Sequence, residues 1–341
     1  MSDVTDTAPS GRMKEPVFLL GAPRSGTSLT YSVLLLSGQF PVYRAETHLL
    51  DVCKPIYGDI TDPGNRRRFL EEWVKSGQFR RAGVDEETFL RSAERPFRNY
   101  GEFLRLFMEQ VARAQGKERW LEKTPGHIFE ACNLLRWFPD ARFLHVVRDG
   151  RDVALSLRNK GWLSSRRGGS LAQLISAARL WYRAMAFGRW LQREAGDRYM
   201  EFRYEDLVRR DEETLRRINR FTGIELSYPQ IEGERSGALS GGDTTYRQAM
   251  VGLSVKGSFR WEEEMSPLEQ QVITYCLRDA LAEKGYRVDV PMPPLSPRLR
   301  AKLAWWMNGV VIAAKYWLRH NTPLGRHARR ALDFEERGAD G

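Results

Sequence analysis

The sequence predicts an α/β fold with a central, mainly parallel sheet and a P-loop-like turn. A short apolar run, residues 17–20, leads into a glycine-containing turn and then into a helix-like stretch at residues 28–36. Strand, turn and helix in this order open a doubly wound fold. Two more strand-like segments lie at residues 142–147 and 198–203. With 42% hydrophobic and 29% charged residues among 341, the chain has the composition of a soluble globular protein that buries a core.

The first half of the chain combines predicted strands with a helical insertion. We expect a buried parallel strand at residues 17–20, because all of its side chains are apolar. A second short strand is expected at residues 40–43, after Gly38. About 75 residues of charged, helical pattern follow, up to Arg119. We interpret them as an insertion that covers the sheet.

The second half supplies the remaining predicted strands and two helices. Further strands are expected at residues 120–121, 142–147 and 198–203. An amphipathic helix is expected over residues 212–221, and a last helix of the sheet domain over residues 267–284.

Two stretches rich in loop-forming residues divide the chain. Residues 237–257 are rich in glycine, serine and threonine, and a loop of this length indicates a function. Prolines crowd residues 291–297 and mark the clearest domain boundary. We therefore expect a disordered lead at residues 1–15, a main domain at residues 16–290 and an extension at residues 291–341.

The net charge of +10 is concentrated near the C-terminus. Eight lysines and arginines, and no acidic residue, lie between Arg298 and Arg330, which leaves about +2 for the rest of the chain. Nucleic-acid binding requires a basic face on the folded domain. The small net charge left outside residues 298–330 therefore argues against nucleic acid as a partner.

Cysteine spacing and the first residues bear on the compartment. The three cysteines, Cys53, Cys132 and Cys276, are widely spaced. This pattern predicts neither a disulfide framework nor a zinc site, and it indicates a reducing compartment. Residues 1–14 are polar and lack the apolar stretch of a signal peptide. We therefore expect a cytoplasmic protein.

Residues 21–27 resemble the phosphate-binding loop of nucleotide-binding proteins. Gly21 and Gly26 bracket four residues, and the amides of such a turn, with the following helix N-terminus, bind an anion. Thr27 stands where a P-loop ATPase has its lysine, which argues against an ATP–Mg²⁺ site. The cation lies earlier, at Arg24, and suits a donor with a single 5′ phosphosulfate. The alternatives are a βα turn that merely connects and an atypical kinase that uses ATP.

A second candidate phosphate site follows the predicted strand at residues 142–147. Arg148 stands at the carboxyl end of that strand, where open α/β sheets bind ligands. Ser156 lies two turns along the next helix, and an arginine with a hydroxyl can hold a terminal phosphate. Taken alone, the segment fits better an arginine paired with Asp149 or Asp152 on a solvated turn.

Together these segments resemble sulfotransferases that use 3′-phosphoadenosine 5′-phosphosulfate (PAPS), in particular the bacterial and tyrosylprotein-type members. Residues 21–27 are similar to their 5′-phosphosulfate loop, and Arg148 with Ser156 to their 3′-phosphate pair. The resemblance covers residues 16–290. Three shorter segments also fit it: residues 122–125, 202–207 and 257–261.

The resemblance implies a sheet of five parallel strands, PAPS as the donor and no metal. It also implies that the 5′ phosphosulfate is held by the loop and the start of its helix, namely by Arg24, Ser25, Gly26, Thr27 and Ser28.

Sulfuryl transfer is similar to phosphoryl transfer, so catalysis consists mainly of positioning and charge stabilisation. Arg24 is the first candidate cation, because the loop holds it beside the 5′ phosphate. Lys123 is the second, since it ends a predicted strand and matches the active-site lysine of the resembled family. A solvated lysine at the end of a strand is the alternative for Lys123.

A general base must take the acceptor proton, and we favour Glu46. This residue lies just past the expected second strand and matches the glutamate of the tyrosylprotein-type members. His127 is the rival, although Pro125 stands where cytosolic members carry their histidine. His48 is a third candidate, whereas His145 is interpreted as a core histidine of its strand.

Residues 240–261 are expected to close over the 3′ phosphate. Arg260 is expected to reach in, with Ser258 and Lys256 as further candidates. Tyr204 is a candidate for contact with adenine, and core packing is its favoured alternative.

Residues 303–318 form an apolar run with tryptophans and basic residues near both ends. This pattern fits a helix that lies in the interface of an anionic membrane. A helix packed on the main domain or in a homodimer contact fits equally. The run is shorter than the roughly 20 residues that cross a bilayer.

The sequence leaves the acceptor open, because a sugar, lipid, peptide or small molecule with a hydroxyl or amine fits equally. In the resembled family, acceptor recognition lies in variable insertions, here residues 50–118 and 160–195. A non-catalytic nucleotide- or membrane-binding protein is the remaining alternative. The joint presence of Arg24, Glu46 and Lys123 argues against it.

Overall fold

A parallel sheet forms the centre of the molecule. The computed structural model describes residues 13–161, 170–233 and 253–321. Four strands lie in these ranges: β1 (Val17–Gly21), β2 (Leu121–Glu122), β3 (Arg142–Val147) and β4 (Tyr199–Arg203). Their order across the sheet is β2-β1-β3-β4, and all neighbours are parallel. The turns that follow β1 and β3 are adjacent, because Gly21 pairs with Val146.

Both faces of the sheet are buried, as is usual for parallel strands. Successive side chains of β1 enter different cores, with Phe18 and Leu20 in the larger core and Val17 and Leu19 in the smaller one. The continuous apolar run at residues 17–20 is therefore explained by burial on two sides.

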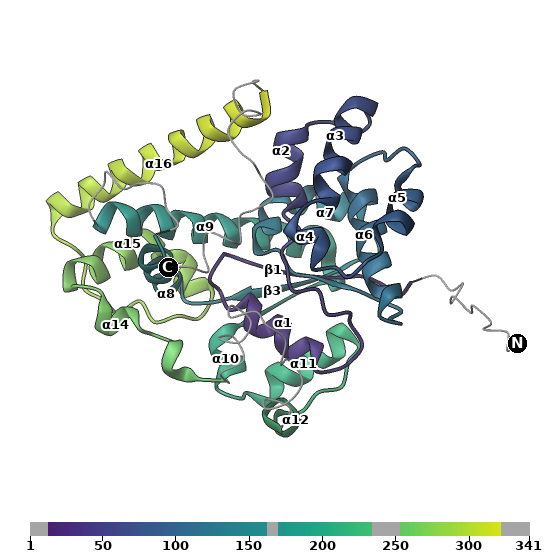
Figure 1. Cartoon of the computed structure of the whole chain (residues 1–341). Coiled ribbons are helices and arrows are strands. Elements are labelled where there is room, and N and C mark those ends of the chain that lie inside the picture. Colours follow the sequence, from purple (N-terminus) through teal and green to yellow (C-terminus); the bar gives the residue numbers. More distant parts are fainter. Residues whose placement is uncertain (1–12, 162–169, 234–252, 322–341) are drawn as a thin grey trace, which may run out of the picture.

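Helices cover the two faces and give three layers (Figure 1). The smaller core is closed by α1 (Thr27–Leu35), α10 (Tyr204–Val208), α11 (Glu212–Thr222) and α12 (Tyr228–Gly233). On the other face, the larger core is closed by α7 (Ala131–Trp137), α8 (Gly150–Asn159), α9 (Ser170–Ala195) and α15 (Pro267–Glu283).

The chain between β1 and β2 forms the expected helical insertion. It contains η1 (Leu49–Cys53), α2 (Lys54–Tyr57), α3 (Pro63–Val74), α4 (Gly77–Arg80), α5 (Glu86–Ala93) and α6 (Tyr100–Ala114). Aromatic rings hold these helices together; for example, the ring centroids of Phe69 and Phe103 are 4.6 Å apart. Such edge-to-face pairs add to the stabilisation from apolar burial.

The strand expected at residues 40–43 is not formed. The backbone N–H and C=O of Val42 bond to the side chain of Gln115, at 2.8 and 3.0 Å. Those of Tyr43 bond to the hydroxyl of Tyr31, both at 2.9 Å. Side chains thus occupy the groups that a strand ladder would use. Within the described ranges the sheet has four strands rather than the expected five.

The C-terminal helix α16 (Leu295–Asn321) lies along the outer side of α9 and α15 (Figure 1). Ala301 is buried, and Arg179 of α9 donates to the carbonyl oxygen of Trp305 at 2.6 Å. The Ser176 hydroxyl of α9 donates to Asn308 at 2.9 Å. Among the helices in the described ranges, none combines the length and apolar character needed to span a bilayer.

Candidate active site

The two candidate phosphate sites meet at the carboxyl edge of the sheet. The glycine-containing loop follows β1 and Arg148 follows β3, and these strands are neighbours. Open α/β sheets bind ligands at this edge, where the strand order reverses. Ser156 reaches the same place from α8, since its hydroxyl accepts a hydrogen bond from Arg24 Nε at 3.2 Å. The structure therefore brings Arg24, Arg148 and Ser156 together.

The loop after β1 has an unusual backbone. Gly26 has a φ of 91°, and a Cβ there would lie 2.2 Å from the ring of Tyr204, so glycine is required. Arg24 also lies in the left-handed region, with a φ of 73°, which costs a non-glycine residue about 1–3 kcal/mol. Thr27 and Ser28 begin α1, and amides in the first turn of a helix have no partner within it. These amides are therefore available to bind an anion.

Arg148 is held in place from several sides. Its Nη1 donates to the carbonyl oxygen of Arg24 at 3.1 Å, and its Nη2 donates to that of Gly257. Its guanidinium lies 5.0 Å from the ring centroid of Tyr204 and 3.8 Å from Asp152. The contact with Asp152, expected as an alternative for this arginine, is thus present, but Arg148 also joins the loop.

The two arginines give this edge of the sheet a positive potential. Burial, together with the nearby Arg148 charge, lowers the pKa of Arg24, while Glu46 partly offsets this effect. Two positive charges held close together at a partly buried position favour binding of an anion at that position.

Three buried polar atoms converge on the same region. Within residues 13–161, 170–233 and 253–321, Ser25 Oγ, Arg148 Nε and Ser258 Oγ have no hydrogen-bond partner. Buried polar groups are rarely left unsatisfied in native proteins. One of these atoms is in the loop and two lie on the Arg148 side, so a ligand with an anionic group at each end would satisfy them.

Asp152 fastens the segment after Gly257 to α8. Its two carboxylate oxygens accept the backbone N–H groups of Phe259 at 2.6 Å and Trp261 at 3.0 Å. Phe259 has a left-handed φ of 60°. Burial raises the pKa of Asp152 to about 6, against the opposing effect of Arg148. At the start of α8, Arg151 pairs with Asp149 at 2.7 Å.

Glu46 and Lys123 form the second part of the site. Lys123 follows β2, and its Nζ donates to Glu46 Oε1 at 2.7 Å. The lysine side chain is 4% exposed, whereas that of Glu46 is 24% exposed. Glu46 is close enough to Arg24 to affect its pKa. Glu46 therefore lies near both Arg24 and Lys123, with access to solvent.

Behind Glu46 runs a chain of alternating carboxylates and histidines. His48 Nε2 lies 3.4 Å from Glu46 Oε2, and its Nδ1 lies 3.0 Å from Asp51. His127 lies 3.8 Å from Asp51 and 3.2 Å from Glu122. Burial of Asp51 is outweighed by the two histidines, which lower its pKa to about 2.

His127 itself is fully buried in η2 (Pro125–Glu130). Burial alone would lower its pKa, but the carboxylates of Glu122 and Asp51 raise it above the ordinary value. The same pairing lowers the pKa of Glu122, which also accepts a hydrogen bond from Thr47 at 2.9 Å. The pairs that His127 makes with Asp51 and Glu122 connect η2 with η1 and β2.

Several predicted residues lie apart from this cluster. The side chain of Arg260 is exposed and donates to Glu264 at 2.6 Å. His145 is buried against the Tyr199 hydroxyl at 2.7 Å, and burial lowers its pKa to about 4. The Lys256 side chain and residues 240–252 lie outside the described part of the chain.

The structure adds residues that the sequence did not single out as part of the site. Asp152 was considered only as a partner of Arg148, yet it holds the segment from Phe259 to Trp261. Glu122 and Asp51 appear as partners of His127. A signal existed for Asp152, in the repeated Arg-Asp pairs at residues 148–152, and for Glu122, in the family-like segment at residues 122–125. Asp51 and Glu122 are 71 positions apart in the sequence, and only the fold relates them.

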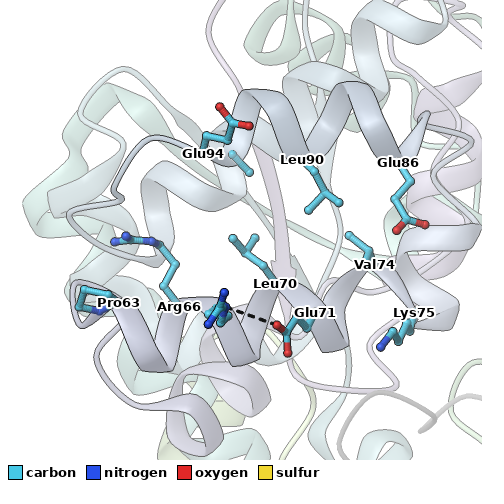
Figure 2. Close-up of a pocket in the computed structure, with 11 residues that line it drawn as sticks. Pro63, Arg66, Leu70, Glu71, Val74, Lys75, Glu86, Leu90 and Glu94 are labelled. Atoms are coloured by element: carbon cyan, nitrogen blue, oxygen red, sulfur yellow. Dashed lines mark ion pairs between the residues drawn. The ribbon is translucent and has the colours of Figure 1, made fainter.

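Two grooves lie elsewhere on the molecule. Figure 2 shows one of about 370 Å³ between α3 and α5, with Leu70, Val74 and Leu90 inside and charged side chains at the rim. The other, of about 610 Å³, includes Arg142 and Tyr199, the first residues of β3 and β4. It therefore lies at the amino edge of the sheet, opposite the candidate site. Neither groove contains a residue of the phosphate loop.

Within residues 13–161, 170–233 and 253–321, no group of three or more histidine, cysteine, aspartate or glutamate side chains is placed to hold a metal ion.

Comparisons with known proteins relate this chain to sulfotransferases. Residues 16–228 match the model of the sulfotransferase family. The chain is 25% identical over 279 residues to protein-tyrosine sulfotransferase 1 of Danio rerio, covering 79% of this chain and 72% of that protein. Its fold is similar to the sulfotransferase domain of the curacin biosynthetic pathway (TM-score 0.55, 16% identity, 81% and 99% of the two chains). It is also similar to the sulfotransferase domain of the Synechococcus PCC 7002 olefin synthase (TM-score 0.52, 20% identity, 81% and 97%).

Proposed function

Because the chain belongs to the sulfotransferase family, we propose that it moves the sulfuryl group of PAPS to an acceptor hydroxyl or amine. The observation that carries the proposal is the position of Arg24. This residue contacts Ser156 and Arg148 and lies near enough to Glu46 for that carboxylate to affect its pKa. It therefore links a site suited to a nucleotide phosphate with a site suited to proton transfer.

The chain offers anion-binding groups for both ends of the donor. The 5′ phosphosulfate fits the loop, where Ser25 Oγ is unsatisfied and the first amides of α1 are open. The 3′ phosphate fits between Arg148 and Ser156, with Ser258 Oγ as a further donor. Tyr204, stacked beside Arg148, forms one wall of the site.

The cations stabilise charge that develops during transfer. The S–O bond to the 5′ phosphate breaks while a new S–O bond forms to the acceptor, so negative charge grows on the departing phosphate oxygen. We propose that Arg24, in the loop, stabilises that oxygen. Lys123, which follows β2, is the proposed contact of the sulfuryl oxygens. The protein holds both cations in place before the reaction begins. Charges that need not move during the reaction stabilise the transition state most effectively.

Glu46 is the proposed general base. It takes the proton of the acceptor hydroxyl as the new S–O bond forms, and adenosine 3′,5′-bisphosphate leaves with its 5′ phosphate. His127 does not fit this role, since it is fully buried and its imidazole is paired with Glu122 at 3.2 Å. His48 contacts Glu46 and is proposed to orient it.

Calorimetric titration tests the donor assignment. We expect the protein to bind adenosine 3′,5′-bisphosphate more tightly than ATP–Mg²⁺. Replacing Arg148 by alanine removes charge-assisted hydrogen bonds, each of about 1.5–3 kcal/mol, so the affinity for the bisphosphate should fall by about tenfold or more. Adenosine 5′-monophosphate is the matched control ligand, because it lacks the 3′ phosphate and should bind the R148A variant and the original chain alike.

Two results would contradict the proposal. Tighter binding of ATP–Mg²⁺ would favour the kinase alternative. An equal loss of affinity for the bisphosphate and the monophosphate in R148A would show that Arg148 does not hold the 3′ phosphate.

A further inference from the structure

The outward face of α16 is apolar, although it faces solvent. Leu299, Leu303, Trp306 and Val310 follow one another at spacings of three and four residues, so they lie on one side of the helix. Their exposed fractions are 58%, 58%, 66% and 49%. Scattered exposed apolar residues are ordinary, but a continuous apolar face marks an interaction site.

The opposite face of the same helix already has its partners. Ala301 is buried, and Trp305 packs against Tyr182 with ring centroids 5.5 Å apart. Asn308 bonds to Ser176 of α9. The helix is thus fastened to the main domain over residues 301–308, and the apolar outward face of this part is fixed in orientation.

The charged residues that border this face on α16 are basic. Arg300 and Lys302 are exposed on α16 close to Leu299 and Leu303, and the sequence from residue 290 to residue 332 contains no acidic residue. An apolar helix face with basic borders is the pattern of helices that lie in the surface of anionic membranes. Trp306, with a ring suited to the headgroup region, stands near the middle of the face.

We propose that α16 binds the surface of a bilayer that contains anionic lipid, with its axis in the membrane plane. The apolar side chains from Leu299 to Val310 enter the boundary between headgroups and acyl chains. Arg300 and Lys302 contact lipid phosphates. The main domain, fastened to the inner face of α16, is then held at the membrane surface.

Charge also favours a membrane over a second copy of this chain as the partner of the apolar face of α16. In a twofold dimer the same face meets itself, so the basic borders of two copies would be brought together. Like charges opposed across an interface are unfavourable. An anionic bilayer supplies the opposite charge, together with an apolar layer for Trp306 and its neighbours.

Vesicle flotation with the full chain tests the proposal. The vesicles contain either phosphatidylcholine alone or equal parts of phosphatidylcholine and phosphatidylglycerol. We expect binding to the anionic vesicles, decreasing with salt. A W306S/V310S variant should lose about tenfold or more in affinity, as should R300E/K302E, since each basic residue near an anionic surface contributes to binding. Leu268 on α15 is 41% exposed, and L268S is the matched control that should bind normally.

Light scattering and thermal unfolding complete the test. All four substituted positions of α16 are exposed, so the variants should keep the thermal stability of the original chain. Equal vesicle binding by the original chain and W306S/V310S would overturn the proposal. So would a dimer that dissociates in W306S/V310S without any vesicle binding, since that result would assign the face to a second copy.

Discussion

The two carboxylate oxygens of Glu46 lie close to different side chains, those of Lys123 and His48. Lys123 donates to one oxygen at 2.7 Å and His48 lies 3.4 Å from the other. His48 has a left-handed φ of 49°, and Asp51 holds its other nitrogen at 3.0 Å. Left-handed, non-glycine residues cluster at functional sites. Of the four such residues in the described ranges, Arg24, His48 and Phe259 border this site.

Replacing Glu46 by glutamine tests the proposed base. The E46Q side chain keeps the shape of glutamate but cannot take a proton. We expect sulfuryl transfer to fall by about 10²–10⁴-fold, while the affinity for adenosine 3′,5′-bisphosphate changes little. Release of the bisphosphate from PAPS, measured with a panel of phenol, sugar and peptide acceptors, gives the rate. Glu118 is exposed and pairs with Lys14, so E118Q is the matched control and should be fully active. Unchanged transfer by E46Q would exclude Glu46 as the base.

Sequence patterns located the charged residues of the site but not how they are connected. Gly21, Gly26 and Arg148 could be predicted because each stands next to the carboxyl end of an apolar strand, where parallel sheets place their ligands. Arg260 could not be placed, because an exposed arginine has many possible partners, and here it pairs with Glu264. The link between Arg24 and Ser156 joins positions 132 apart and depends on the packing of α8 against the sheet.

At the scale of elements, β2, η1 and η2 are connected by buried charges rather than by a long ladder. β2 has two residues, and Glu122 within it accepts from Thr47 and faces His127. Removing one member of a buried ion pair leaves the other uncompensated, at a cost of about 3–5 kcal/mol.

The ion pair of His127 predicts a particular pH dependence. The pKa of His127 is raised from 6.5 in the folded protein, so its stabilisation is fully present below about pH 6.5 and is lost as the pH rises through the folded pKa. The unfolding free energy of the original chain should therefore decrease as the pH rises above about 6.5. H127Q should be less stable at the lower pH and nearly independent of pH over this range.

Urea unfolding at several pH values measures this difference. H145Q is a suitable control, because burial lowers the pKa of His145 to about 4 and the residue is neutral throughout the range. A parallel decrease in H127Q and in the original chain would show that other groups cause it.

Elements with an apolar run and a clear end were predictable. The strands at residues 17–20 and 142–147 and the helix at residues 212–221 match β1, β3 and α11 closely. Residues 41–49 show why the extra strand was wrong: buried and partly exposed side chains alternate there, as in a strand. The sequence pattern shows this alternation. Strand pairing, however, depends on the hydrogen-bond partners of the backbone, which here are the side chains of Gln115 and Tyr31.

At the scale of the whole molecule, α16 packs on the main domain, which is one of the interpretations that the sequence left open; the membrane interpretation stays a proposal. Its inner face packs on α9 and α15, and its outer face remains apolar and exposed. A helix can serve as a scaffold element and an interaction surface when its two faces differ. The described residues of the candidate site lie between Gly21 and Trp261, and α16 begins at Leu295.

A chain ended at Val290 tests whether the extension is separable from the sulfotransferase domain. Arg278 of α15 still bonds to the Val290 carbonyl at 3.0 Å, so the end of the shortened chain keeps its anchor. We expect an affinity for adenosine 3′,5′-bisphosphate within about twofold of that of the full chain, measured by calorimetry. The unfolding free energy should fall by about 2–4 kcal/mol, because the contacts of Trp305 and Ala301 with the main domain are lost. Loss of bisphosphate binding in a chain that still unfolds cooperatively would show that α16 supports the donor site, and the boundary predicted at residue 291 would then be wrong.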